Sequence, residues 1–265
     1  MEDGSLWLSG RLTTDIQSWP KEPEKLVDAN VTAMVAGYRH FLFLKKDGSI
    51  WGMGDNGSGQ LGDGTNTDRL SPIRIIETGV TMVSAGRFHS LFLKSDGSVW
   101  GMGHNSYGSL GVGDNENKSS PVKLDIDGVV AVKAGGRHSC FLKSDGTLWT
   151  AGRNSSGQLG DGTTVDRNLP LQVATGVTTV SFGCDSHHTL FRKTDGSLWA
   201  VGHNSRGQLG TAPLGNTVST PREVTSGVAD QGSTGTTSFG TFSFAPADGN
   251  GSTHNHFFTS TRTAR

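Results

Sequence analysis

Histidines that recur at a fixed spacing are the first candidates for chemistry in this chain, because imidazole nitrogens are common zinc ligands. They stand at intervals of 49, 49 and 50 residues: His40, His89, His138 and His188. Zinc needs its ligands at about 2.0–2.1 Å, whereas equivalent atoms of successive packed sheets lie on the order of 10 Å apart. We therefore expect no metal site, and predict that each histidine is buried and hydrogen-bonded to turn backbone.

Two loop patterns resemble ligand sites without completing them. Residues 57–62, GSGQLG, spell the G-x-G-x-x-G of dinucleotide-binding turns, but no helix or βαβ unit is indicated after them. The acidic residues of 55–64 lack the glutamate that ends a calcium loop. No nucleophile elbow, HExxH motif or carboxylate pair stands out. The sequence predicts a protein that is not an enzyme and binds no cofactor.

Charge and composition argue against a protein that binds nucleic acid or spans a membrane. The net charge of −1 gives no basic field for nucleic acid or an anionic membrane, and no apolar run approaches the ~18 residues of a membrane span. The N-terminus lacks the pattern of a secretory signal, so the cytoplasm is the default expectation, with a microbial surface as the alternative. Cys140 and Cys184 are expected to be free thiols or one bridge.

The histidines belong to a repeated unit. The segment DGSIWGMGDNGSGQLGDG at 47–64 returns at 96–114, 145–162 and 195–211, and a partial copy occupies 3–10. Within a unit, runs such as 83–85, 89–94 and 98–103 and a short strand starting at Pro121 predict four strands per ~50 residues, which is typical of a β-propeller blade. We interpret the repeated tryptophans, like the histidines, as structural framework: Trp51, Trp100, Trp149 and Trp199.

We predict an all-β propeller of about five four-stranded blades over residues 1–249. The chain begins at the third strand of a unit, and 227–249 reads as a degraded first half that ends in Asp248-Gly249. The last blade is therefore expected to be closed by N- and C-terminal strands, which would remove open sheet edges. Residues 250–265 are a polar tail, expected to be disordered or ordered by a partner.

The pattern AG-x-x-H, DG-x-x-W-x-x-G-x-N-x-x-G-x-LG and Pro resembles the regulator of chromosome condensation repeat, from residue 3 to about 226. The resemblance implies a propeller that binds proteins on one face, and one member's activity implies guanine-nucleotide exchange on a small GTPase as a function. Members are mostly seven-bladed, whereas this chain supplies about five blades. The ring is thus either five-bladed or completed by another chain.

Positions that vary between units yet stay polar or aromatic indicate a partner surface. Two such series lie at expected strand ends, hence on a rim: Asp55, His104, Arg153 and His203 after the W-x-x-G strand, and Tyr38, Arg39, Arg87, Phe88 and Arg137 before the repeat histidine, with Tyr107 and Arg206 as further candidates in the loops. Tyrosine and arginine are enriched in binding hot spots. We predict a non-catalytic propeller that binds another protein through this rim. The alternative is a self-assembling homo-oligomer in which a C-terminal strand completes a neighbour's blade.

Overall fold

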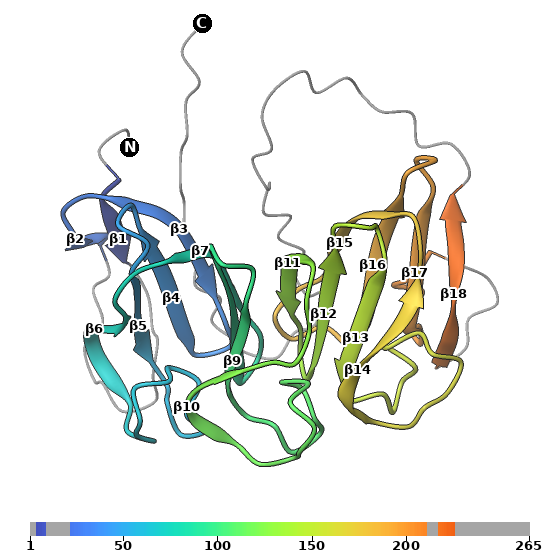
Figure 1. The fold of residues 1–265 in the computed structure, drawn as a ribbon, viewed down its shortest axis with the longest axis horizontal. Helices are drawn as coiled ribbons and strands as arrows, with labels where there is room; N and C mark the ends of the chain where they lie inside the picture. The colour runs from blue at the N-terminus through green and yellow to red at the C-terminus, as the bar shows by residue number, and fades with distance from the viewer. Residues whose placement is uncertain (1–3, 9–21, 211–216, 226–265) are drawn as a thin grey trace, which may run out of the picture.

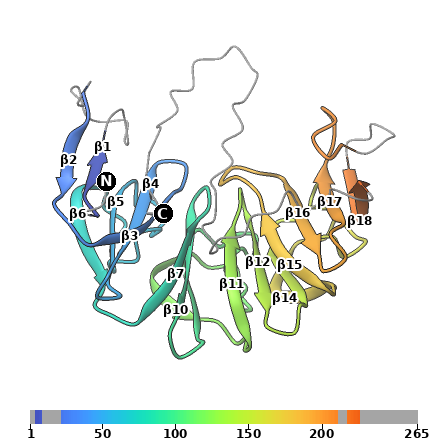
Figure 2. The ribbon, with the colours of Figure 1, turned by 90° about the horizontal axis from the view of Figure 1, so that it is seen from above.

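The computed structural model describes residues 4–8, 22–210 and 217–225, and these form strands and turns throughout. The strands make four antiparallel sheets of four strands and one sheet of two. Figures 1 and 2 show the sheets following one another around an arc, with the β1–β2 sheet at one end and β18 at the other. The predicted all-β propeller is confirmed, and each four-stranded sheet is one blade.

The elements keep chain order. The two-stranded sheet pairs β1 (Leu6–Leu8) with β2 (Glu24–Val27). The first blade has β3 (Val31–Ala36), β4 (His40–Lys45), β5 (Ile50–Gly54) and β6 (Arg69–Ile76). The second has β7 (Val80–Ala85), β8 (His89–Lys94), β9 (Val99–Gly103) and β10 (Lys118–Lys123). The third has β11 (Val129–Ala134), β12 (His138–Lys143), β13 (Leu148–Gly152) and β14 (Arg167–Ala174). The fourth has β15 (Val177–Ser181), β16 (His188–Lys193), β17 (Leu198–His203) and β18 (Thr217–Thr225).

The fourth strand of a blade is longer than the sequence predicts. We expected it to start at Pro121, but β10 begins at Lys118 and contains that proline. Pairing with β9 shifts register between Lys118 and Val122. Such an irregularity leaves a position without a ladder hydrogen bond, and there the missing N–H of proline costs nothing.

The central hairpin of each blade is built the same way. The second strand places a phenylalanine opposite the repeat tryptophan of the third, as Phe43 does opposite Trp51. In the turn between them, the Asp47 carboxylate accepts hydrogen bonds from the N–H and hydroxyl of Ser49, at 2.9 and 2.6 Å. The Trp51 indole N–H donates to the same hydroxyl at 3.0 Å, and the Lys45 ammonium lies 4.5 Å from the ring centroid. The half-buried tryptophan therefore joins the turn to the sheet.

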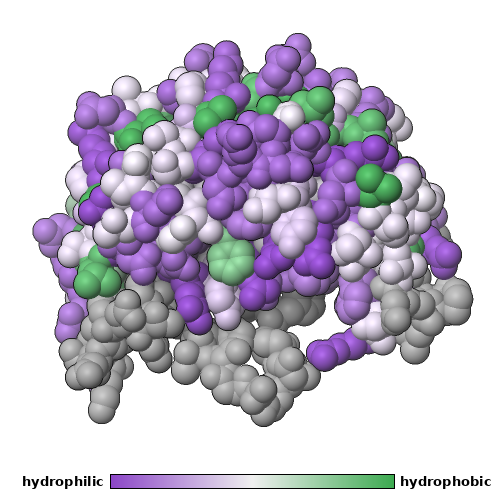
Figure 3. Space-filling view, turned by 90° about the horizontal axis from the view of Figure 1, so that it is seen from below, coloured by the Kyte–Doolittle hydropathy of each residue, from purple (hydrophilic) through white to green (hydrophobic). Residues whose placement is uncertain are grey.

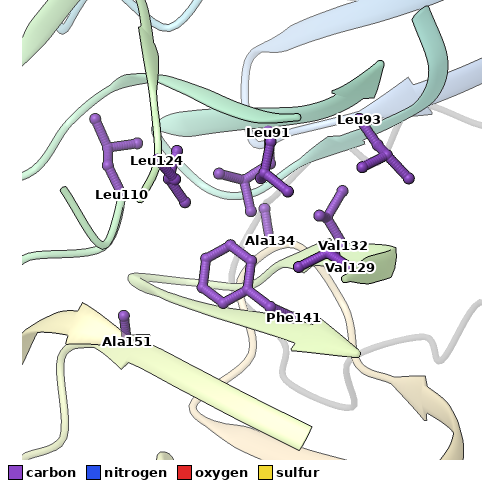
Figure 4. Close-up of a cluster of buried hydrophobic side chains, with 10 residues drawn as sticks. Leu91, Leu93, Leu110, Leu124, Val129, Val132, Ala134, Phe141 and Ala151 are labelled. Atoms are coloured by element: carbon purple, nitrogen blue, oxygen red, sulfur yellow. The ribbon is translucent and has the colours of Figure 1, made fainter. Parts of the chain in front are cut away.

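Apolar side chains fill the space between neighbouring blades. Figure 4 shows one such cluster, in which Leu91 and Leu93 of the second blade face Val129, Val132 and Phe141 of the third. Phe141 is fully buried. Because dispersion and the hydrophobic effect act across the whole contact, each blade is stabilised mainly by its neighbours.

The repeat histidines join one blade to the next. His40 Nε2 lies 3.0 Å from the hydroxyl of Ser90, which donates to the Gln60 carbonyl at 2.8 Å. We call this arrangement a histidine–hydroxyl junction. It recurs twice, from His89 through Ser139 to the Ser109 carbonyl and from His138 through Thr189 to the Gln158 carbonyl.

The prediction that these histidines hydrogen-bond to turn backbone was wrong in one respect. All three are buried, but a hydroxyl from the following blade stands between each ring and the loop backbone. The fourth histidine differs: His188 is half-buried, and its Nδ1 lies 3.0 Å from the Ser186 hydroxyl of its own blade. The end of the arc thus uses a local partner where the inner blades use a neighbour.

Several expectations concern other parts of the chain. The closing segment 227–249 and the tail 250–265 lie outside the described residues. Both cysteines are free, and Cys140 is buried. Within the described ranges, no helix is long and apolar enough to cross a membrane.

Candidate protein-binding rim

The two variable series predicted from the sequence meet on one rim. In each blade, the amide at the end of the third strand or directly after it donates to the carbonyl that precedes the second strand. Asp55 N–H donates to the Arg39 carbonyl at 2.8 Å, and His104 N–H donates to the Phe88 carbonyl at 2.8 Å. The same bond joins Arg153 to Arg137, at 2.9 Å, and His203 to His187, at 2.9 Å. Both series therefore leave the sheets at the same edge.

A glycine fixes this edge in each blade. Gly103 has φ +104°, and a Cβ there would lie 2.6 Å from the Phe88 carbonyl oxygen. A side chain would push apart the two strand ends that present His104 and Phe88. The W-x-x-G glycine is thus required by backbone conformation and by close approach together.

Aromatic rings and guanidinium groups form a row from the first blade into the second. Tyr38 and Phe88 meet edge to face, with ring centroids 6.0 Å apart. The Arg87 guanidinium contacts both rings, 4.7 Å from the Tyr38 centroid and 5.1 Å from that of Phe88. The Arg39 guanidinium also lies over the Tyr38 ring, 5.2 Å from its centroid. Such cation–π contacts hold arginine side chains in place while leaving charge at the surface.

The row continues into the third blade. His104 lies 6.2 Å from Phe88 and 5.8 Å from Tyr107, centroid to centroid. Arg137 donates from Nη1 to the Tyr107 hydroxyl at 2.9 Å. Arg153 lies 5.2 Å from the centroid of Tyr107. We call the whole row the arginine rim: Tyr38, Arg39, Arg87, Phe88, His104, Tyr107, Arg137 and Arg153.

One contact of the rim crosses a whole blade. Arg87 Nη1 of the second blade lies 2.8 Å from the Asp185 carboxylate of the fourth. Gly136 occupies the matching position of the third blade, where a Cβ would already lie 2.8 Å from the Ser186 carbonyl. Because Gly136 has no side chain, Arg87 can extend across the third blade to Asp185. Sequence reasoning missed Asp185, although the glycine in a series of large residues was a signal.

Burial and neighbouring arginines disfavour the protonated form of His104 in the rim and of His187 beside it. Burial lowers the pKa of His104, and the charge of Arg137 lowers it further. Burial also lowers the pKa of His187, with Asp185 opposing this change and Arg153 adding to it. The four arginines of the rim outnumber the nearby carboxylates of Asp55 and Asp185, so this region carries excess positive charge.

Two predicted residues lie apart from the row. The Asp55 carboxylate accepts from Gly57 N–H of its own loop at 3.0 Å. His203 contacts the Ser205 hydroxyl at 3.1 Å and the Gln208 amide at 2.6 Å, also in its own loop. They flank the arginine rim instead of joining it.

Other kinds of site have little support. In the part of the chain that the structure describes, no group of three or more His, Cys, Asp or Glu side chains could hold a metal ion. On the face drawn in Figure 3, hydrophobic residues form small separate areas among hydrophilic ones. The described residues visible on that face form no broad apolar patch of the kind that marks obligate interfaces.

Comparison with known proteins gives a consistent result. A sequence model of the RCC1-like domain matches residues 2–243. Over 54 residues, 20% of this chain and 12% of the relative, the sequence is 37% identical to the ultraviolet-B receptor UVR8 of Arabidopsis thaliana.

Solved structures show the same fold. One is Prp20p from Saccharomyces cerevisiae, described with its binding properties to Gsp1p and histones: TM-score 0.74, 22% identity, 84% of this chain and 59% of that chain. Another is human WBSCR16: TM-score 0.68, 26% identity, 83% of this chain and 66% of that chain. The chain spans about three fifths of the length of Prp20p.

Proposed function

Because the chain belongs to the family of RCC1-like domains, we propose that it is a non-catalytic propeller that binds another protein through the arginine rim. The observation that carries this proposal is the row of stacked arginine and aromatic side chains contributed by successive blades. Arginine and tyrosine supply much of the energy at protein interfaces. That Prp20p has binding properties to Gsp1p and histones supports a protein as the partner.

The arginine side chains of the rim are preorganised for binding. Arg87 and Arg137 are held by rings and by hydrogen bonds to Asp185 and the Tyr107 hydroxyl. Side chains ordered in advance lose less conformational entropy on binding, which favours affinity. Tyr38, by contrast, is 41% exposed and offers ring surface to a partner.

The charge of the rim indicates what the partner presents. Four arginines face two aspartates in this region, and only Arg87 is paired with one of them among the described contacts. Guanidinium groups bind carboxylates through two parallel hydrogen bonds. We propose an acidic protein segment as the partner's contribution.

The test compares two triple variants of the full chain. Arg39→Ala/Arg87→Ala/Arg137→Ala removes three charges from the rim, while Lys46→Ala/Arg74→Ala/Lys123→Ala removes three from the opposite end of the blades. Each is immobilised and exposed to lysate of the native source, and retained proteins are identified and then titrated as pure proteins. We expect the partner's Kd to rise at least 100-fold for the rim variant, about 2.7 kcal/mol, and to be unchanged for the control.

Equal retention of every protein by both variants would contradict the proposal, provided that circular dichroism shows both to be folded. Raising the salt concentration is a second readout. Binding carried by arginine and carboxylate must weaken as salt screens the charges.

Self-assembly is the second candidate, and one observation favours it. Among the described strands, β1 pairs only with β2 and has an open edge. Such an edge accepts a strand from another chain. A solution mass of twice 27.9 kDa or more would support this function. Guanine-nucleotide exchange is implied by the family alone, and no described contact adds to it.

A further inference from the structure

An open groove lies where the third blade meets the fourth. Its volume is about 440 Å³, within the ~300–1,000 Å³ of ligand-binding pockets. On the side of the third blade it is lined by Ala174 at the end of β14 and by Thr175 directly after it. On the side of the fourth blade it is lined by Phe191 and Lys193 of β16 and by Trp199 of β17.

The groove lies at the opposite end of the fourth blade from the arginine rim. The strand β16 begins at His188, on the side of the rim, and ends at Lys193 in the groove. The strand β17 runs back from Trp199 to His203, whose N–H bonds to the His187 carbonyl. A ligand in the groove would leave the rim accessible, so its binding is independent of the function proposed for the rim.

Between the second and third blades, the chain itself fills the matching place. Ile126 packs against the buried cluster of Figure 4, and Trp149 packs against the same cluster. The Asp127 carboxylate lies 3.1 Å from the Lys143 ammonium, which is 4.6 Å from the centroid of Trp149. An isoleucine followed by an aspartate thus occupies apolar space and pairs with the lysine over the tryptophan.

The segment Ala174-Thr175 holds the same position at the groove. The glycines that follow the two segments, Gly128 and Gly176, have φ +65° and +68°. The Gly128 carbonyl accepts from Ser144 N–H at 2.9 Å, and the Gly176 carbonyl accepts from Thr194 N–H at 2.8 Å. The two turns therefore have the same backbone course, with alanine and threonine at the groove in place of isoleucine and aspartate.

The first blade also has an isoleucine at this point. Ile76 holds the ladder position of Ala174, because each pairs with the first residue of the third strand of its blade. Ile76 packs against a buried cluster on which Trp100 also packs. Alanine in the third blade leaves the space of this side chain open, which accounts for the groove beside Trp199.

The lysine of the groove lacks the carboxylate partner that Lys143 has. The Lys193 ammonium lies 4.0 Å from the centroid of Trp199. Within the described ranges, no carboxylate forms an ion pair with it. Asp195 of the adjacent turn accepts instead from the N–H and the hydroxyl of Ser197, at 2.9 and 2.6 Å. The groove therefore presents an apolar wall and a cation together.

We propose that this groove binds a protein segment in which an aliphatic residue is followed directly by an acidic residue. The aliphatic side chain packs against Phe191 and Trp199, and the carboxylate pairs with Lys193. Apolar burial supplies most of the affinity, and the ion pair selects the acidic residue. The partner supplies to the fourth blade what Ile126 and Asp127 supply to the third.

A second groove provides the control. It has a volume of about 500 Å³ and is lined by Phe43, Lys45 and Trp51 of the first blade. Its lining includes a carboxylate of its own, Asp28, which lies 3.5 Å from the Lys25 ammonium. An acidic segment is repelled by this carboxylate, so we expect it to prefer the groove at Trp199.

The test titrates the full chain with a capped peptide of the sequence of residues 124–128, Leu-Asp-Ile-Asp-Gly. Binding is followed by NMR through the indole N–H signal of Trp199, assigned with Trp199→Phe. We expect saturable binding with a Kd of about 1 mM or tighter. Alanine in place of the peptide isoleucine should raise the Kd about tenfold, because the buried aliphatic side chain is lost. Asparagine in place of the second aspartate should raise it about threefold, as for an exposed ion pair.

Variants of the protein complete the test. Ala174→Ile/Thr175→Asp fills the groove with the residues of the second blade and should abolish binding. Lys193→Gln should raise the Kd about threefold, whereas Lys45→Gln should leave it unchanged. No saturable shift in the folded wild-type chain, equal Kd values for the three peptides, or full binding by the filled variant would overturn the proposal. If the filled variant does not fold, the two lysine variants decide, and equal Kd values for them would overturn it.

Discussion

The buried histidines act as neutral connectors between blades. Burial lowers the pKa of His40 to about 4 and, with nearby histidines adding to the effect, lowers the pKa of His89 and His138 to about 3. Each hydroxyl gives its hydrogen to a loop carbonyl, so the ring Nε2–H donates to the hydroxyl oxygen while the ring is surrounded by protein. Protonation would place an uncompensated charge in the junction.

Stability is therefore expected to fall with acid in a defined window. The unfolded histidines titrate near 6.5 and the folded ones near 3 to 4, so the unfolded state binds more protons between these values. The free energy of unfolding should fall from pH 6 to pH 5 by up to about 1.4 kcal/mol per histidine. Carboxylates with lowered pKa, such as Asp96, contribute only below their unfolded value of about 3.9. Urea unfolding across this range measures the slope.

The control for the acid effect is His89→Gln, which keeps hydrogen-bonding capacity but does not titrate. It should reduce the slope by up to about 1.4 kcal/mol per pH unit. A wild-type free energy of unfolding that is constant from pH 6 to pH 5 would show that these histidines are protonated in the folded state.

Two glycines of the second blade allow two reasons for glycine to be measured separately: a backbone with positive φ, and a neighbouring backbone that leaves no room for a Cβ. Gly97 has φ +80° and nothing within 4 Å of a built Cβ, whereas at Gly103 the Phe88 carbonyl lies 2.6 Å away. Gly97→Ala should cost about 1–2 kcal/mol, the price of a left-handed alanine. Gly103→Ala should cost clearly more, because backbone must also move. Thermal unfolding measures both losses of stability. Equal losses would mean that the backbone near Phe88 moves aside for the added methyl group at no further cost.

At this scale the sequence allowed prediction of residues with local roles. The turn aspartates, the tryptophan positions and the shared rim follow from spacing within one unit. The hydroxyl of Ser90 and the carboxylate of Asp185 did not follow, because each acts on another blade. Their partners stand 50 and 98 residues away, and a repeat pattern does not say which face of a unit meets the next.

Between elements, the histidine–hydroxyl junction and the apolar cluster act together. The Ser139 hydroxyl bonds to His89 at 2.9 Å and to the Ser109 carbonyl at 2.6 Å. Removing it leaves two buried polar groups without a partner. The apolar side chains of Figure 4 stay in place, so such a change isolates the polar part of the junction.

Ser139→Ala should lower the free energy of unfolding by about 1–3 kcal/mol, the cost of unsatisfied buried groups. Ser144→Ala, at an exposed site of the same blade, is the control and should change it by less than about 0.5 kcal/mol. In a double-mutant cycle with His89→Leu, the double variant should lose less free energy of unfolding than the sum of the two single losses. Full additivity would show that the serine and the histidine are not coupled.

The strands themselves were the most predictable elements. The run His89–Lys94 was placed correctly, because a β-rich apolar run bounded by glycine and an Asp-Gly turn leaves few alternatives. The fourth strand was placed late, since its first residues, Lys118 to Ser120, are polar and half-buried or exposed. Their pairing depends on the neighbouring third strand more than on their own sequence.

For the whole molecule, protection from hydrogen exchange should depend on the number of neighbouring blades. The strands β8 and β12 lie in blades with an apolar cluster on each side. Their amides should exchange hydrogen at least tenfold more slowly than those of the two-stranded β1–β2 sheet. Hydrogen exchange with mass spectrometry measures this, and equal exchange in the two groups would contradict it.

The directional junction sets a rule for how such a chain can grow. An inner repeat offers an imidazole to the blade after it and a hydroxyl to the blade before it. A tandem duplication of such a repeat would therefore supply the hydrogen-bond partner needed at both of its sides. In the first blade the residue after the repeat histidine is Phe41, where the second and third blades have Ser90 and Ser139. A copy of the first blade placed after another blade would set this phenyl ring against a histidine that requires a polar partner. The junction is therefore compatible with extra copies of the second or third blade and incompatible with an extra copy of the first.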